Sequence, residues 1–337
     1  MRTLYYIIAL CCILFVACKQ DPAFPREKTL TYELMPLQGV THPFGLTVRH
    51  PFLMLLNLNR IDSLFHVYNL NTHELTHVFG VIGGGPDEFI FPTILSSTSL
   101  SNFLISDYSS RGEEISIFEI NPNGLAVLKG TKHPNPNNVH GAMGAIFIND
   151  SLYILQDWVL FTPYIHMFTL QDEQPRKSWQ FRFSDVMEPW FDIDDGSVFA
   201  NDSRIVFAYQ LKKQIDFMDI DFNLIRRVSF NHRHPRSVSR ENQHEVKRTY
   251  TAGFLGNRFF YALFKGASWN EWLNNPYFRG SILEVFDLDG NPIIRYRLDG
   301  IVPSRFVVDE ETFTLYGFRD DNEPEDHLIV YRLLGLQ

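Results

Sequence analysis

The sequence predicts an all-β fold: a six-bladed β-propeller with four-stranded antiparallel blades, its ring closed by an N-terminal strand in the last blade. Two observations support this fold class. First, a short strand such as Glu-Val-Phe-Asp-Leu at 284–288 recurs six times, centred on Tyr68, Phe118, Phe168, Met218, Phe286 and Tyr331. Second, these centres are 50, 50, 50, 68 and 45 residues apart, and a strand repeat of about 50 residues is typical of propeller blades.

The composition of the 337-residue chain agrees with a large protein built from packed sheets. Hydrophobic residues make up 45% and charged residues 20% of the chain, which is enough apolar material for a sizeable core. The 30 phenylalanines favour sheets over a helical bundle, and no long segment has a helical period. The formal net charge of −9 argues against nucleic-acid binding, because phosphates require a basic surface.

The first 17 residues are predicted to be a secretory signal peptide. Arg2 precedes a short apolar run that ends at Ala17, as is typical of a leader, and the run is shorter than the roughly 18 residues of a membrane-spanning helix. Residues 14–18, Leu-Phe-Val-Ala-Cys, resemble the lipobox of bacterial lipoproteins, which implies that Cys18 is lipidated. The alternative is an ordinary cleaved signal peptide followed by an incidental cysteine. We expect an exported protein, lipid-anchored in the cell envelope, with the outer membrane as its location and a periplasmic or surface face.

The leader also defines the predicted domains. Residues 1–17 are the signal peptide, residues 18–28 a short lipidated tether, and residues 29–337 the propeller domain. Because Cys11, Cys12 and Cys18 are the three cysteines, the mature chain would have no thiol for a disulfide or a nucleophile. We expect a monomeric domain that contacts the membrane through its lipid anchor only.

Each repeat is assigned four strands. The first three blades are predicted at 45–49, 52–58, 64–70 and 75–82; at 94–98, 103–107, 115–120 and 125–130; and at 145–148, 152–156, 165–170 and 177–183. The next two follow at 197–199, 204–209, 214–220 and 224–230, and at 250–255, 259–264, 282–288 and 292–298. Several strands are apolar on both faces, as expected for sheets that lie between neighbouring sheets.

The sixth blade has only three predicted strands, at 305–308, 313–318 and 328–333. Residues 29–37 precede the first blade, belong to no repeat and have the composition of a strand. We expect this segment to pair as the outer strand of blade six. Such pairing would join the two ends of the chain and would cover an exposed sheet edge.

The connections between strands fall into two classes. The turns between first and second strands and between third and fourth strands are short, as at 50–51, 201–202 and 289–291, and are rich in Asn, Asp and Gly. The other connections are longer and, in a meandering blade, emerge on one rim of the disc: 83–92, 131–144, 157–164, 184–196, 231–249, 265–280 and 319–327. Since binding residues often lie on long loops of a rigid scaffold, we expect the ligand on this long-loop rim.

The segment 83–92, Gly-Gly-Gly-Pro-Asp-Glu-Phe-Ile-Phe-Pro, is the most specific local motif. It resembles the Gly-x-Gly-Pro-x-x-Phe-x-x-Pro junction of NHL-like repeats and of TolB-like six-bladed β-propeller lipoproteins. The resemblance implies a tight crossing between blades in which Phe89 is buried, while Asp87 and Glu88 could face the central channel. It also implies recognition in the cell envelope. A phosphate-binding loop is not supported, because no helix pattern and no Lys-Ser/Thr pair follow.

Aromatic and basic side chains in the long loops are the candidate binding residues. Exposed aromatic rings give a large contact area on sugars or peptides at low entropic cost, and arginines bind anions. The alternatives are aromatic rings that pack the loops onto the blades and a solvated basic loop. The candidates are Trp158, Trp190, Arg233, Arg236, Trp269, Trp272, Tyr277 and Arg279, with Arg240 in the same basic loop.

Signals for catalysis or for a metal are weak. His232 and His234, with His244 as a third ligand, are weak candidates for a metal site, and the Asp194–Asp195 and Glu113–Glu114 pairs are expected to be solvated carboxylates in turns. No nucleophile elbow or His-Glu-x-x-His motif is present. Some propellers of similar fold are calcium-dependent lactonases whose ligands come from several blades.

The sequence therefore predicts a binding or scaffold module that recognises an envelope protein, a peptide or a glycan through the long-loop rim, without a cofactor. The alternative is a hydrolase or lactonase that needs a divalent cation such as calcium and has its site on the ring axis. Convergence of three or more carboxylate, amide or histidine groups around the axis would favour the enzyme.

Overall fold

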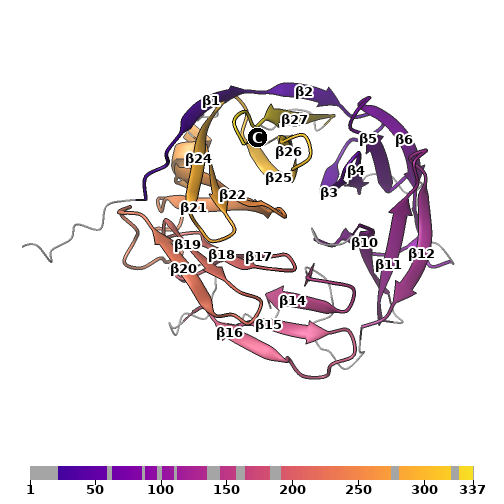
Figure 1. The fold of residues 1–337 in the computed structure, drawn as a ribbon, viewed down its shortest axis with the longest axis horizontal. Coiled ribbons are helices and arrows are strands. Elements are labelled where there is room, and N and C mark those ends of the chain that lie inside the picture. The colour runs from indigo at the N-terminus through magenta and orange to yellow at the C-terminus, as the bar shows by residue number, and fades with distance from the viewer. Residues whose placement is uncertain are drawn as a thin grey trace, which may run out of the picture.

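The computed structural model describes residues 22–58, 63–85, 88–96, 101–109, 112–134, 145–156, 164–182, 191–274, 281–319 and 326–336. These residues form six small sheets arranged in a ring (Figure 1). The predicted six-bladed β-propeller is confirmed. Among the residues just given, no helix is long and apolar enough to cross a membrane.

Each blade is an antiparallel meander whose first strand faces the ring axis. Blades one and two contain β3 (Pro43–Arg49), β4 (Phe52–Asn57), β5 (Phe65–Asn69) and β6 (Glu74–Phe79), then β9 (Pro92–Ile94), β10 (Phe103–Ser109), β11 (Gly112–Ile120) and β12 (Ala126–Lys132). Blades three and four contain β13 (Ile146–Phe147), β14 (Leu152–Gln156), β15 (Tyr164–Thr169) and β16 (Lys177–Gln180), then β17 (Gly196–Ala200), β18 (Ile205–Tyr209), β19 (Gln214–Met218) and β20 (Leu224–Ser229).

Blade five contains β21 (Arg248–Leu255), β22 (Phe259–Ala267), β23 (Ile282–Asp287) and β24 (Pro292–Asp299), and blade six β25 (Pro303–Asp309), β26 (Thr314–Arg319) and β27 (His327–Arg332). A six-residue helix, α2 (Trp269–Asn274), lies between β22 and β23. No helix was predicted there, because six residues are too few for a helical period to be recognised.

The N-terminal segment closes the ring, but it does so as two strands. β2 (Glu33–Pro36) pairs antiparallel with β27, with Met35 opposite Leu328, and completes blade six as predicted. β1 (Glu27–Thr31) instead pairs parallel with β24 and adds a fifth strand to blade five. The prediction of one continuous strand at 29–37 is therefore wrong in its first half. Tyr32 lies between the two strands, and its ring packs on Tyr331 with centroids 6.2 Å apart.

The glycine-rich junction after blade one forms a compact local structure. β7 (Val81–Ile82) and β8 (Glu88–Phe89) pair in parallel, and the Gly85 N–H donates to the Glu88 carboxylate at 2.6 Å. Phe89 is buried and its ring packs edge-on against Phe65 at 5.2 Å. The predicted burial of Phe89 is confirmed, so this motif is a structural crossing between blades.

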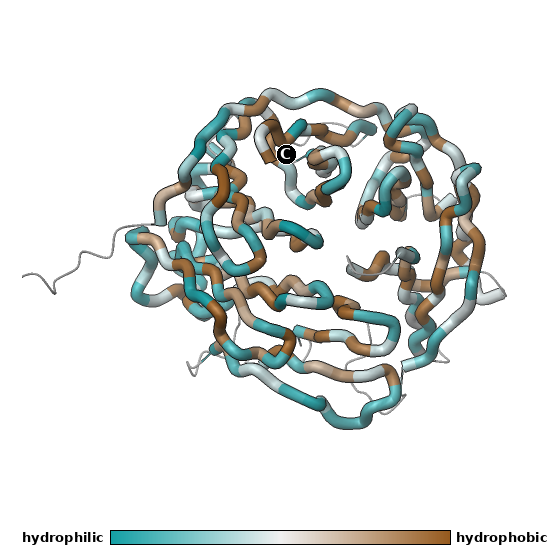
Figure 2. Tube along the Cα trace, viewed as in Figure 1, coloured by the Kyte–Doolittle hydropathy of each residue, from teal (hydrophilic) through white to brown (hydrophobic). Residues whose placement is uncertain are grey.

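The core lies between the blades rather than in one central mass. Each of the six interfaces between neighbouring blades has its own cluster of buried apolar side chains. All six residues of β4 and all five of β18 are buried, which explains strands that are apolar on both faces. Figure 2 shows hydrophobic stretches within the blades and hydrophilic stretches at many turns. The apolar core is therefore distributed around the ring axis.

Candidate functional site

A cavity of about 420 Å³ occupies the ring axis. Its walls come from the first strand of every blade, namely β3, β9, β13, β17, β21 and β25. This volume lies within the range of sites that hold small ligands or one end of a larger ligand. The axis is therefore a candidate site assembled from all six repeats.

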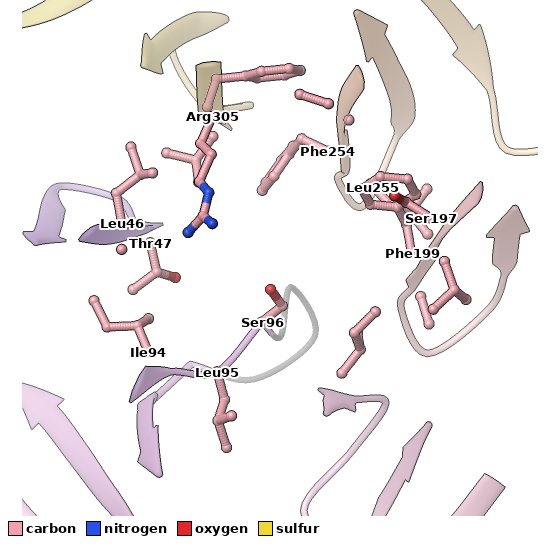
Figure 3. A pocket seen from close by; sticks show the side chains of 18 of the residues that line it. Leu46, Thr47, Ile94, Leu95, Ser96, Ser197, Phe199, Phe254, Leu255 and Arg305 are labelled. Atoms are coloured by element: carbon pink, nitrogen blue, oxygen red, sulfur yellow. The ribbon is translucent and has the colours of Figure 1, made fainter. Parts of the chain in front are cut away.

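Arg305 is the most conspicuous polar group in the cavity. Figure 3 shows its guanidinium directed into the opening, with Thr47 and Ser96 on one side and Phe254 on another. The guanidinium donates to the Phe44 carbonyl at 3.0 Å and lies 5.2 Å from the centre of the Phe44 ring. No carboxylate of the described residues pairs with it.

The rest of the lining suits an anionic group on a partly apolar ligand. Hydroxyl groups come from residues on several blades, Thr47, Ser96, Ser197, Thr251 and Ser304, and aromatic rings from Phe199 and Phe254. A guanidinium offers five N–H donors in a planar fork that matches carboxylate or phosphate oxygens. No Asp or Glu is among the described residues that line this cavity, so its positive charge is not offset locally.

The first strand of each blade runs from the long-loop rim to the short-turn rim. Arg305 is the third residue of β25 and Arg49 the last residue of β3, so Arg305 belongs to the long-loop half of the channel and Arg49 to the opposite end. Burial lowers the pKa of Arg49 to about 10, and its guanidinium donates to the Val48 carbonyl at 2.6 Å. A ligand entering from the long-loop rim would meet Arg305 first.

A second cavity of about 370 Å³ lies at the short-turn end and shares Arg49 and Phe254 with the axial cavity. Here His50 Nδ1 lies 2.9 Å from the carboxylate of buried Asp309. The neighbouring Glu310 accepts hydrogen bonds from three backbone N–H groups, those of Asn257, Arg258 and Phe259, at 2.8–3.1 Å. Burial raises the pKa of Glu310 above its usual range. These acidic side chains are already engaged in contacts between blades.

Two of the sequence-predicted aromatic residues lie on α2. The Trp269 and Trp272 rings are 5.0 Å apart, and the Lys265 ammonium lies 4.9 Å from the Trp272 ring centre. Ser268 caps the helix, since its Oγ accepts the Glu271 N–H at 3.1 Å while the Glu271 carboxylate accepts the Ser268 N–H at 2.8 Å. This Ser-x-x-Glu pattern was the sequence signal for the missed helix.

The predicted basic loop meets α2. The Asn270 N–H donates to the His244 carbonyl at 3.0 Å, and Lys247 lies 3.1 Å from the Glu271 carboxylate. Arg233 and Arg236 are exposed, and neither pairs with a carboxylate of the described residues. The structure thus brings the two long insertions around blade five together, although neither contributes to the axial cavity.

The histidine candidates do not converge in the part of the chain that the structure describes. The His232 ring packs edge-on against Phe264 at 5.6 Å, and His234 Nδ1 lies 2.9 Å from the Pro235 carbonyl. Within the described ranges, no three His, Cys, Asp or Glu side chains are grouped as metal ligands. Asp309, Glu310 and Glu311 line the short-turn cavity together with His50, but within these ranges they are not grouped as metal ligands. The calcium-dependent hydrolase at the axis stays a prediction.

The remaining predicted site residues, Cys18, Trp158, Trp190, Tyr277 and Arg279, lie outside the described residues, as does Asp87. Their proposed roles stay predictions. Conversely, Arg305 was not recognised from the sequence, because an arginine in a strand is ordinary and only the closed ring shows which face points to the axis.

A buried polar cluster beside β17 also differs from expectation. Asp195 is only 3% exposed, and burial raises the pKa of its carboxyl to about 7, partly offset by a backbone hydrogen bond from Gly196 and by the charge of Arg182. Glu113 is likewise buried and accepts a hydrogen bond from Ser106. The prediction that both acidic pairs lie solvated in turns is wrong for these two members. Glu113 lies within β11 and contacts Ser106 of the neighbouring strand β10, and Asp195 is buried directly before β17. Asp194 is partly exposed and pairs with Lys212.

Comparison with a solved structure supports the fold. A crystal structure of a member of the DUF4221 family from Bacteroides vulgatus matches with a TM-score of 0.54 and 15% identity, covering 90% of this chain and 97% of that one. A crystal structure from Bacteroides fragilis, described as that of a proposed exported protein, matches with a TM-score of 0.48 and 10% identity, covering 91% of this chain and 97% of that one. No family model and no curated protein matches the sequence. At this identity the likeness concerns the fold alone.

Proposed function

We propose that this chain is an exported, lipid-anchored binding module of the cell envelope that recognises an acidic group of its ligand in the axial cavity. The ligand enters from the long-loop rim. The observation that carries this proposal is the Arg305 guanidinium, which points into a cavity of about 420 Å³ and has no carboxylate partner among the described residues.

The energetics favour an anion over a neutral ligand. A hydrogen bond to a charged group contributes about 1.5–3 kcal/mol, and a guanidinium without a carboxylate nearby does not have to give up an ion pair on binding. Hydroxyl groups and aromatic faces around it can hold the uncharged part of the ligand. A uronic acid of a glycan and a carboxylate of a peptide share this chemistry, and the envelope is expected to present both.

The test is an array that carries acidic and neutral oligosaccharides together with acidic and neutral peptides. The mature protein should bind acidic members of one class, glycan or peptide, and Arg305→Ala should weaken that binding by about tenfold to a hundredfold. Arg305→Lys keeps the charge but loses the fork, and should recover only part of the affinity.

The matched control is Arg297→Ala, which removes an exposed arginine from β24, where Arg297 pairs with Glu27 of the outermost strand β1 at 3.2 Å. It should bind like the unchanged protein. Equal binding by the Arg305→Ala and Arg297→Ala variants would reject the axial cavity as the acidic-group site. The same array probed with Trp269→Ala and Trp272→Ala combined tests the prediction that the rim aromatics hold the ligand directly.

A further inference from the structure

The chain is held firmly where it enters the ring. The Phe24 ring packs against Phe230 and Phe286, with centroids 6.3 and 5.3 Å away, and the Arg295 guanidinium lies 4.5 Å from the Phe24 ring centre. Arg295 is itself fixed by buried Glu284 at 3.0 Å. The tether therefore leaves from a defined groove between blades four and five.

The tether leaves beside the basic loop. Pro22, Ala23 and Phe24 share one surface pocket with Asn231 and His232, the first two residues of that loop. The distance from there to a membrane is limited, because Cys18 precedes Pro22 by four residues, and four extended residues reach about 14 Å. If Cys18 carries the lipid, this edge of the ring stands next to the bilayer.

The edge of the ring at blades four and five also exposes large apolar side chains to solvent. Trp269 is 49% and Leu273 is 55% exposed, and α2 buries none of its residues. The contacts of His232 with Phe264, and of Lys265 with Trp272, connect the tether groove to α2. In the view through the ring, the short helix lies toward the outer edge (Figure 1).

The net charge of the basic loop on this edge, residues 231–247, is opposite in sign to that of the whole protein. The chain as a whole carries −9, whereas residues 231–247 contain four Lys or Arg and two Glu. Exposed Arg233 and Arg236 have no carboxylate partner among the described residues. Tryptophan, leucine and arginine together are typical of segments that lie in the headgroup region of a bilayer.

We propose that α2 and the 231–247 loop form a second membrane contact, which docks the blade-four and blade-five edge of the propeller onto an anionic bilayer. This inference rests on the proposed lipid anchor at Cys18. The disc then stands on this edge, and its axial mouth opens beside the membrane rather than against it.

The test uses the full-length, lipidated protein reconstituted into vesicles of phosphatidylethanolamine and phosphatidylglycerol. The mature chain has no cysteine other than Cys18, so Leu273→Cys provides a single site for an environment-sensitive fluorophore. Asn123→Cys is the control, on the short-turn rim of blade two. The label at 273 should emit further to the blue and be quenched by a lipid-borne nitroxide about twofold or more strongly than the label at 123.

The outcomes separate this inference from the proposal that supports it. Weak quenching at 273 while the protein still cosediments with vesicles would overturn the docking alone. Failure to cosediment would overturn the lipid anchor and the docking together. A blue shift at 273 without quenching would show burial against protein instead of lipid, and would also overturn the docking.

Charge variants give a second measurement. Combined Arg233→Ala and Arg236→Ala should lower the equilibrium constant for docking about fivefold for each arginine removed, because each basic residue near an anionic surface contributes about 1 kcal/mol. The matched pair Lys129→Ala and Arg332→Ala, on blades two and six, makes the same change in net charge and should leave quenching at 273 unaltered. Equal effects of the two pairs would contradict a local patch.

Discussion

The two rims of the disc are built differently. On the short-turn rim, neighbouring blades are joined by side chains: Asn201 of blade four donates to the Gly256 carbonyl at 2.8 Å, and His50 of blade one contacts Asp309 of blade six at 2.9 Å. On the long-loop rim, the described insertions around blade five contact each other and expose aromatic and basic side chains. Side chains also join blades on the long-loop rim, where Gln156 of blade three donates to the Gly196 carbonyl of blade four at 2.9 Å. The two rims differ because the long-loop rim also carries the exposed aromatic and basic side chains around blade five.

The largest expected effect comes from cutting a connection on the short-turn rim. Glu310→Ala would leave three backbone N–H groups and the Tyr261 hydroxyl without their acceptor. The free energy of unfolding should fall by about 3 kcal/mol, as for other losses of a buried network, measured by urea denaturation. Glu119→Ala, which removes an exposed partner of Lys129, should cost about 0.5 kcal/mol or less. Similar losses of stability for both variants would contradict the role of Glu310 in joining blades five and six.

A smaller, pH-dependent effect is expected on the long-loop rim. Burial raises the pKa of the folded Asp195 carboxyl to about 7, from an ordinary value of 3.8, so the folded carboxyl binds its proton more tightly than the unfolded one. Stability should therefore be lost as the pH rises from about 4 to about 7. Asp195→Asn removes this titration, so the unfolding temperature of the variant should change less over that range and exceed that of the unchanged protein at pH 8.

The control for that experiment is Asp194→Asn, at the adjacent carboxylate that pairs with Lys212 on the surface. Its unfolding temperature should follow the same pH dependence as the unchanged protein. A pH profile altered by Asp194→Asn and left intact by Asp195→Asn would show that the buried carboxyl has been misidentified.

The smallest expected effect is that of calcium. A dication in the axial cavity would meet the Arg305 charge and no carboxylate among the described lining residues, and calcium requires 6–8 oxygen ligands. Asp309 and Glu310, in the cavity at the short-turn end, already contact His50 and the backbone of blade five. Calorimetric titration with calcium should give no stoichiometric heat. Stoichiometric heat, lost together with any hydrolytic activity on chelation, would instead favour the cation-dependent hydrolase.

Much of the ring could be predicted from the sequence because repetition makes it visible. Strands recur at a nearly constant interval, and a blade that lacks a strand requires a partner from the other terminus, which β2 supplies. The division of the N-terminal segment at Tyr32 could not be predicted, because both halves have strand character and their partners, β24 and β27, lie far away in the sequence.

The candidate site was harder to predict for a physical reason. The groups at the axis come one strand at a time from blades far apart in sequence, so no local motif contains them; Arg305 and Thr47 are an example. Burial of Asp195 depends in the same way on packing by other segments. Trp269 and Trp272, by contrast, were candidates from their residue type alone; the structure places both on α2, and their binding role stays a prediction.

The most direct test of this account is a structure of the protein with the strongest acidic member of the array. We predict ligand density in the axial cavity, with an acidic group about 3 Å from the Arg305 guanidinium and the remainder of the ligand extending toward the long-loop rim. Ligand density confined to the short-turn rim, or located away from Arg305, would contradict the placement of the binding site at Arg305 in the axial cavity.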